Sequence, residues 1–136
     1  MKFQESNEGW SLSLEEGTVQ LIQIDFRVSL LLSDKSAKST LIIEQPCSLK
    51  KSHEASFLLV PEQTSSLSPI LPFFNAKVEK IDIQRTGELT LKFNNGYFLE
   101  VMPNAQYEAW QLSCSIGFML VCIPGGKVEL FKENKV

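Results

Sequence analysis

The residues best suited to molecular recognition gather in the segment 107–110, Tyr-Glu-Ala-Trp. Tyrosine and tryptophan combine a large apolar ring with a polar group, and both are enriched at protein interfaces. In an extended strand, Glu108 and Trp110 would point to the same face. Two alternatives follow for Trp110. Either its indole N–H donates to a backbone carbonyl in the core, which is the alternative we favour, or the ring belongs to a recognition patch with Glu108 at its rim.

A turn with unusual backbone freedom follows at residues 124–126, Pro-Gly-Gly. Glycine adopts positive φ at little steric cost, so turn geometry alone explains Gly125 and Gly126. Backbone amides in such a turn can hold an anion, but nothing else in the sequence supports an anion site here. The candidate partner-binding or ligand-binding residues are Tyr107, Glu108, Trp110, Glu100, Gly125 and Gly126.

Residue types needed for catalysis or metal binding are sparse. His53 is the single histidine, and the sequence contains no H-E-x-x-H, C-x-x-C, G-x-S-x-G or phosphate-loop pattern. This histidine lies in the charged segment 50–54, which is typical of a solvated loop. No two acids stand out as a glycosidase-type pair. We therefore expect no enzyme activity, no metal and no cofactor.

Composition indicates one folded domain over residues 1–136. Hydrophobic residues make up 43% of the chain and charged residues 21%, which is typical of a packed interior. The formal net charge is -3 and no dense basic cluster occurs, so nucleic acid is not an expected partner. The longest apolar runs, residues 28–32 and 57–60, are much shorter than the roughly 20 residues that cross a bilayer, so we expect no membrane span.

The three cysteines, Cys47, Cys114 and Cys122, lack the spacing of a metal site. Their odd number and the absence of an N-terminal charged-then-apolar signal segment favour a reducing cytoplasm. Cys114 and Cys122 would pair only if they lay together on adjacent strands, and small buried thiols are the commoner case. We assign these cysteines no chemistry.

The elements that must position the candidate residues are β-strands, and the clearest signal is in residues 89–101. There, alternating apolar residues flank an Asn-Asn-Gly turn. A two-residue turn would place Glu100 opposite Leu91, in the apolar row. A three-residue loop with Gly96 left-handed instead pairs Leu91 with Leu99 and exposes Glu100. We predict the second register.

The first half of the chain contains further period-two patterns. They predict a short strand, a turn and one long strand, at residues 9–14, 15–17 and 18–32. Residues 40–44 then return as the antiparallel partner of the long strand and end before Pro46. Residues 1–8 are polar and are expected to fray.

Residues 61–72 are rich in proline and serine and cannot enter a sheet interior, because proline donates no ladder hydrogen bond. Within them, Leu67, Ile70 and Leu71 would lie on one helical turn and cover an end of the core. The remaining strands are predicted at residues 57–60, 77–84, 88–94, 97–102, 107–114, 118–123 and 127–131.

Together these elements predict an all-β fold, a mainly antiparallel β-sandwich or partly open barrel of about eight to ten strands. The hairpin over residues 28–44 is similar to the hairpin over residues 89–101. We therefore expect two hairpin-based halves, residues 9–60 and 77–132, joined by the crossover segment 61–76. Whether the halves are a true duplication stays open.

Three motifs in fixed order resemble the signature of an uncharacterised bacterial domain family. They are G-x-L-x-L-x-F-x-[DN]-G over residues 87–96, Y-E-A-W over residues 107–110 and P-G-G over residues 124–126. The resemblance covers residues 73–131 well and the first half only through its hydrophobic pattern. Small members of that family look similar to immunity proteins, so the resemblance alone implies that the chain neutralises a partner toxin.

We therefore expect a non-enzymatic cytoplasmic binding protein that covers the working surface of a toxin-like protein, with Glu100 and Glu108 steering a basic partner. The alternative is a small-ligand-binding β-barrel or sandwich in which Trp110 and Tyr107 line an apolar pocket. A homo-oligomer formed through an edge strand is a further alternative.

Overall fold

The computed structural model describes residues 1–54 and 56–133. Across these residues, twelve strands form one antiparallel sheet that does not close into a barrel, which confirms the predicted all-β fold and exceeds the strand number expected. The elements are β1 (Lys2–Glu5), β2 (Gly9–Ile24), β3 (Val28–Ser33), β4 (Lys38–Ile43), β5 (Cys47–Lys51), β6 (Phe57–Leu59), the 3-10 segment η1 (Thr64–Phe73), β7 (Lys77–Gln84), β8 (Leu89–Phe93), β9 (Tyr97–Val101), β10 (Trp110–Cys114), β11 (Phe118–Cys122) and β12 (Val128–Lys132).

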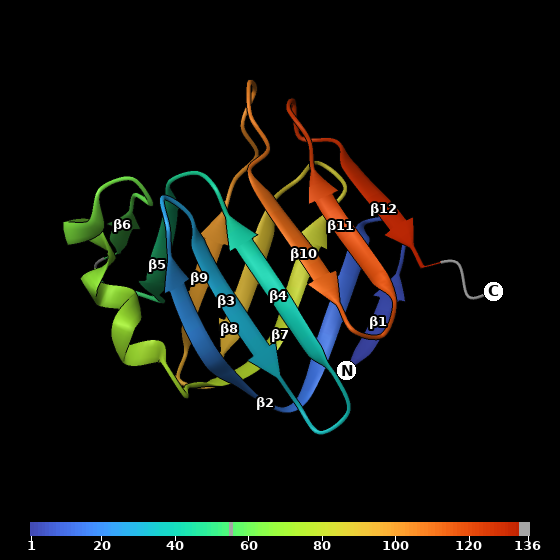
Figure 1. Cartoon of the computed structure of the whole chain (residues 1–136), viewed down its shortest axis with the longest axis horizontal. Coiled ribbons are helices and arrows are strands. Elements are labelled where there is room, and N and C mark those ends of the chain that lie inside the picture. Colours follow the sequence, from blue (N-terminus) through green and yellow to red (C-terminus); the bar gives the residue numbers. More distant parts are fainter. Residues whose placement is uncertain (55, 134–136) are drawn as a thin grey trace.

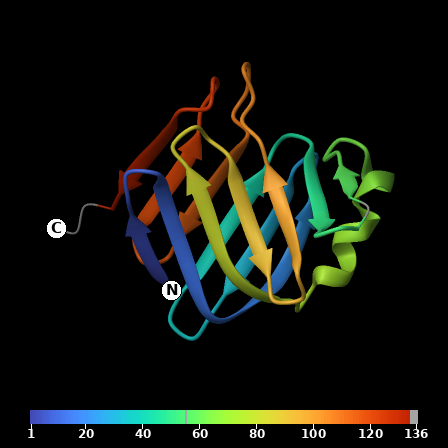
Figure 2. The same ribbon diagram turned by 180° about the vertical axis from the view of Figure 1, so that it is seen from behind.

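The sheet folds over into two layers because β2 bends and belongs to both of them (Figure 1, Figure 2). Residues 9–13 of β2 pair with β7, and residues 18–24 pair with β3. Between these parts the register shifts at a β-bulge, where Glu16 has a φ of 56°. One layer contains β3, β4, β10, β11 and β12, and the other contains β7, β8, β9, β5 and β6.

The core lies between the layers and consists of alternate residues of each strand. Leu41 on β4, for example, pairs with Leu30 on β3 and with Leu112 on β10, and all three side chains are buried. Leucines of β5, β8 and β9 form the matching row of the other layer. Full burial of one such side chain contributes about 1.5–3 kcal/mol, so these rows stabilise the fold without a disulfide.

The predicted hairpin over residues 89–101 is confirmed in its register. Leu91 pairs with Leu99, and Thr90 pairs with Glu100. Gly96 has a φ of 89°, the left-handed conformation that the three-residue loop requires. The leucines therefore face the core, and Glu100 faces outward.

The predicted turn at residues 15–17 and the single long strand over residues 18–32 are wrong. Residues 15–17 continue β2 through its bulge. The chain reverses instead after Ile24, where the backbone N–H of Asp25 donates to the carbonyl of Arg27 at 3.0 Å and the two side chains form an ion pair at 3.1 Å. A bulge uses glycine and left-handed residues as a turn does, so the Glu-Glu-Gly sequence does not distinguish the two.

Two short strands lie where the sequence predicts none. Residues 1–8, expected to fray, contain β1, which pairs with β2. Phe3 of β1 stacks on Phe118 of β11 with ring centroids 3.9 Å apart and so joins the two layers. Residues 50 and 51, expected in a solvated loop, belong to β5. Each strand is too short to show a clear period of two.

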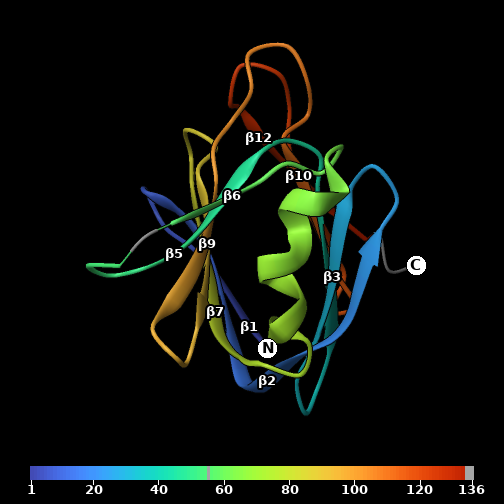
Figure 3. The same cartoon turned by 90° about the vertical axis from the view of Figure 1, so that its left-hand side faces the viewer.

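Segment η1 covers the open side of the sandwich (Figure 3). Leu67 and Ile70 are buried as predicted and Phe73 is buried with them, but Leu71 is 50% exposed. A 3-10 helix has three residues per turn, so residues 67, 70 and 73 share one face and Leu71 does not. Among the residues described, no helix has the length and apolar content needed to cross a bilayer.

Apart from β1 and β12, the strand pairing is unchanged when the two halves of the chain are exchanged. Each half contains a three-stranded meander, β2-β3-β4 or β7-β8-β9, followed by a hairpin, β5-β6 or β10-β11. Each hairpin pairs with the third strand of the other half, β5 with β9 and β10 with β4. The halves predicted at residues 9–60 and 77–132 therefore each contribute strands to both layers.

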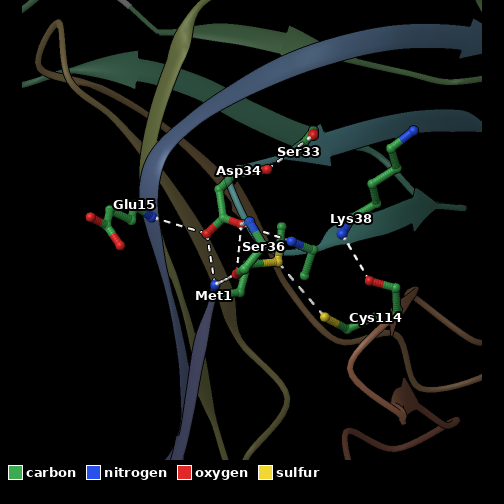
Figure 4. A network of polar contacts seen from close by, with 9 residues as sticks. Met1, Glu15, Ser33, Asp34, Ser36, Lys38 and Cys114 are labelled. Carbon is green, nitrogen blue, oxygen red and sulfur yellow. Dashed lines mark hydrogen bonds and ion pairs between the residues drawn. The ribbon is translucent and has the colours of Figure 1, made fainter.

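An ion pair shielded from solvent holds β1 against the β3–β4 turn. The ammonium group of Met1 lies 2.7 Å from a carboxylate oxygen of Asp34. The same carboxylate accepts backbone N–H bonds from Glu15, Ser36 and Ala37 (Figure 4). Burial by itself would raise the pKa of Asp34, but the ammonium group and these N–H donors outweigh it and hold the pKa well below its usual range.

We expect Asp34→Asn to lower the free energy of unfolding by about 1–3 kcal/mol at neutral pH, because the N–H donors lose their charged acceptor. The folded-state pKa of Asp34 lies below the unfolded value of about 4, so its contribution is complete above that pH and is lost as the pH falls below it. Urea unfolding at about pH 7, 5 and 3 measures both effects. The difference between the wild type and the variant should be the same at pH 7 and 5 and should begin to narrow at pH 3, because the loss is complete only below the folded-state pKa. A difference that widens as the pH falls to 3 would contradict the assignment.

Candidate functional site

Three loops meet at one end of the sandwich, the upper end in Figure 1, and are named here the loop platform. They are residues 85–88 between β7 and β8, residues 102–109 between β9 and β10, and residues 123–127 between β11 and β12. The platform contains four of the six predicted site residues, namely Tyr107, Glu108, Gly125 and Gly126.

Trp110 lies in the core directly next to the platform. Its side chain is 0% exposed, and its indole Nε1 donates a 2.8 Å hydrogen bond to the carbonyl of Gly87. This is the buried alternative that the sequence favours. Trp110 therefore contacts no partner itself, but it connects the first strand residue of β10 to the β7–β8 loop.

Two glycines allow two of the platform loops to touch. A Cβ on Gly87 would lie 2.6 Å from the carbonyl oxygen of Gly126, and a Cβ on Gly126 would lie 2.7 Å from the carbonyl oxygen of Thr86. Both glycines also have positive φ, 102° and 97°. The sequence explains Gly126 by turn geometry alone. The structure adds a second reason, because a side chain at Gly126 would collide with the backbone of the β7–β8 loop.

Asn104 fixes the third loop. Its backbone carbonyl accepts the N–H of Gly125 at 2.9 Å. Its side-chain Oδ1 accepts the N–H groups of Gln106 and Tyr107 at 2.8 and 3.1 Å. These bonds hold residues 104–107 in a turn and attach that turn to the β11–β12 loop. The sequence marks Pro103 and Asn104 as a turn between strands, but Asn104 is not among the site residues that it predicts.

The exposed side chains of the platform include apolar, acidic and basic groups, and the basic ones are Arg85 and Lys127. Tyr107 is 66% exposed and Met102 is 46% exposed, and Glu108 is also exposed. The predicted strand over residues 107–114 begins only at Trp110, so Glu108 and Trp110 do not share a strand face as expected. The backbone of Ala109 accepts the N–H of Glu44 at 3.0 Å and donates to the carbonyl of Cys122 on β11 at 3.2 Å.

Glu100 lies outside the loop platform. Its side chain projects from the outer face of β9, and its carboxylate lies 3.4 Å from the ammonium group of Lys50 on β5. Exposed pairs of this kind contribute about 0–1 kcal/mol. The structure therefore separates Glu100 from the other predicted site residues.

The fold forms an apolar groove away from the loop platform, and neither Tyr107 nor Trp110 is among its described lining residues. That groove has a volume of about 490 Å³ and lies between η1, the hairpin β5-β6 and the start of β9. Phe57, Phe73 and Tyr97 are among its walls. These residues lie far apart in the sequence, and no motif connects them.

The three cysteines are free and buried. Burial raises the pKa of each thiol, that of Cys47 to about 12, so thiolate chemistry is disfavoured. Cys114 and Cys122 lie on adjacent strands but at opposite ends of the pairing, because Cys114 pairs with Phe118 and Cys122 with Trp110. Their positions therefore exclude the disulfide that the sequence left open.

Comparison with known proteins gives a family and no activity. The model of a family of unknown function (DUF6188) matches residues 10–132. The match includes the first half, which the sequence motifs covered only through its hydrophobic pattern. No curated protein and no solved structure matches the chain.

The two tryptophans of the chain permit a matched test of the Trp110 hydrogen bond. Within the described residues, the buried Nε1 of Trp10 has no hydrogen-bond partner, whereas that of Trp110 bonds Gly87. Trp110→Phe and Trp10→Phe remove similar ring volume, but only Trp110→Phe also removes a hydrogen bond. We therefore expect Trp110→Phe to lower the unfolding free energy by about 1–2 kcal/mol more than Trp10→Phe does. Urea unfolding followed by far-UV circular dichroism measures the difference, and equal losses would refute the role of this bond.

Proposed function

We propose that this chain, which belongs to the family of unknown function matched above, is a non-enzymatic binding protein that presents its loop platform to a protein partner. One observation carries the proposal. The exposed Tyr107 and Glu108 stand on loops that Trp110 and Asn104 already hold in place.

Rigid loops favour binding because little conformational entropy is lost when the partner docks. Ordering a flexible side chain at an interface costs about 0.5–1.5 kcal/mol, and ordering loop backbone costs more. The backbone N–H of Tyr107 is already bonded to Asn104, so the exposed ring starts from a defined position. Exposed tyrosine on fixed loops is also the arrangement used by antibody binding sites.

Three acids lie around the platform, against two exposed basic residues, Arg85 and Lys127, of which Arg85 is already paired with Glu5. This balance favours a basic partner. Glu44 and Glu108 are exposed and lie near each other, because the N–H of Glu44 donates to the carbonyl of Ala109 at 3.0 Å. Glu88 adds a third acid, whose carboxylate accepts a hydrogen bond from the hydroxyl of Thr86. Together with the net charge of -3, these acids would accelerate association with a basic surface at low salt.

The chemistry of the remaining side chains supports a non-enzymatic role. His53 is exposed in the turn after β5, and the thiols are buried. No set of three or more His, Cys, Asp or Glu side chains among residues 1–54 and 56–133 is arranged to hold a metal ion. Neutralisation of a toxin, the role implied by the family resemblance, is the concrete form of the proposal, because a platform of this kind would act by covering the toxin's working surface.

Tyr107→Ala is the decisive variant for this proposal. We expect partner affinity to fall by about 30-fold or more, as for other central aromatic residues of interfaces. The unfolding free energy should change by less than about 0.5 kcal/mol, because the side chain is exposed. The measurement is titration calorimetry with the basic protein that copurifies with the tagged chain from its native host.

Phe131→Ala is the matched control, since this aromatic side chain is 48% exposed on β12 and lies outside the platform. It should bind as the wild type does. If the partner is a toxin, co-expression with the wild-type chain should restore cell growth and co-expression with Tyr107→Ala should not. Wild-type affinity in Tyr107→Ala, or equal losses in both variants, would remove the platform from the proposal.

A further inference from the structure

The open side of the sandwich carries a groove that the loop platform does not use. We propose that this groove, between η1 and strands β5, β6 and β9, binds a small amphipathic anion with a flat apolar body and one acidic group. Its volume of about 490 Å³ falls in the range of about 300–1,000 Å³ that is typical of small-molecule sites.

The groove walls are apolar and largely aromatic. Phe57 of β6 pairs with Leu49 of β5, and both side chains line the groove. Tyr97, at the start of β9, and Pro69 and Pro72 of η1 line the remaining sides. Phe57 is 45% exposed, so a ligand placed here would remove a large apolar ring from water.

These walls are held in position before a ligand arrives. Phe73 packs against Phe93 with ring centroids 4.6 Å apart and meets the edge of Tyr97 at 5.3 Å. Two prolines restrict the backbone of η1, the segment that carries Phe73. A groove with fixed aromatic walls suits a flat, rigid molecule better than a flexible chain, because neither side loses much conformational entropy.

A positive charge lies at the rim of the groove. Lys51 follows Leu49 on the same face of β5, because alternate residues of a strand point the same way. Its ammonium group lies 5.6 Å from the ring centroid of Tyr97, which is itself a groove wall. Within the part of the chain that the structure describes, Lys51 enters no ion pair, whereas the neighbouring Lys50 is paired with Glu100.

The polar groups of the groove complement an acidic ligand. The Oδ1 atom of Asn95 accepts the N–H of Tyr97 at 3.0 Å, which leaves the amide NH₂ group of Asn95 as a donor at the groove wall. The hydroxyl of Ser68 provides a second donor. None of the described residues that line the groove carries a carboxylate. An acidic group on the ligand would therefore meet a cation and two donors without a competing anion.

Two dyes that share one ring system separate the apolar and the ionic parts of the proposal. Anilinonaphthalene sulfonate carries an acidic group, and N-phenylnaphthylamine has the same rings without the sulfonate. Both should bind the wild-type chain with one-to-one stoichiometry, measured by fluorescence titration at low salt. We expect Lys51→Gln to weaken the sulfonate about threefold to tenfold and to leave the neutral dye unchanged.

Two further variants test the location. Phe57→Ala should weaken both dyes, because it removes a wall that both would contact. Lys92→Gln on β8 is the matched charge control and should change neither, since Lys92 lies in an ion pair with Asp82 outside the groove. Tyr107→Ala should also change neither, which separates this site from the protein-binding platform. Urea unfolding of each variant shows whether the fold is intact.

Four outcomes would overturn the proposal. Absence of one-to-one binding by the sulfonate dye would exclude the site. Equal effects of Lys51→Gln and Lys92→Gln, or equal effects of Lys51→Gln on the two dyes, would show that no anion is recognised at this rim. Binding unchanged by Phe57→Ala, in a variant that is folded, would place the dye elsewhere.

Discussion

The hydrogen bond from the indole of Trp110 to the carbonyl of Gly87 connects the hydrophobic core to the loops of the candidate site. The ring is fully buried among the strands of one layer, and the acceptor belongs to a loop of the other. A buried carbonyl without a donor would cost about 1–3 kcal/mol, so the bond keeps the β7–β8 loop against the start of β10. The close contact of Gly87 with Gly126 then fixes the β11–β12 loop as well. The shape of the platform therefore depends on the packing of the core.

The exchange of hairpins between the two halves explains why these loops come together. Each meander is followed by a connection to the opposite layer, and the two connections meet at the same end of the sandwich. The side-chain amide of Gln45 donates to the carbonyl of Met102, and the N–H of Glu44 donates to the carbonyl of Ala109. Neither half completes its layers alone, so the connections are held by pairing on both sides. Loops fixed in this way present exposed side chains without a large entropic cost on binding.

The two candidate surfaces differ in the physical basis of recognition. The loop platform carries more acids than bases around it and an exposed tyrosine, which suits a protein surface that excludes water around one ring. The groove beside η1 is concave, aromatic and bordered by Lys51, which suits a small molecule that buries most of its own area. They lie at different places in the fold and use different residues. Binding at either surface is therefore testable without altering the other.

The sequence by itself determined the features that depend on neighbouring residues. Period-two alternation and an Asn-Asn-Gly turn specify the register of residues 89–101, because a slip by one residue would bury Glu100. It also indicated an all-β fold and a buried Trp110. Only the tertiary structure decided between a turn and a bulge at residues 15–17, since both use the same residue types and the choice depends on pairing with β7. The same holds for the site. The Trp110 bond to Gly87 and the meeting of Lys51 with Tyr97 join residues that are distant in the sequence, and contacts of that kind follow from packing between strands rather than from any local pattern.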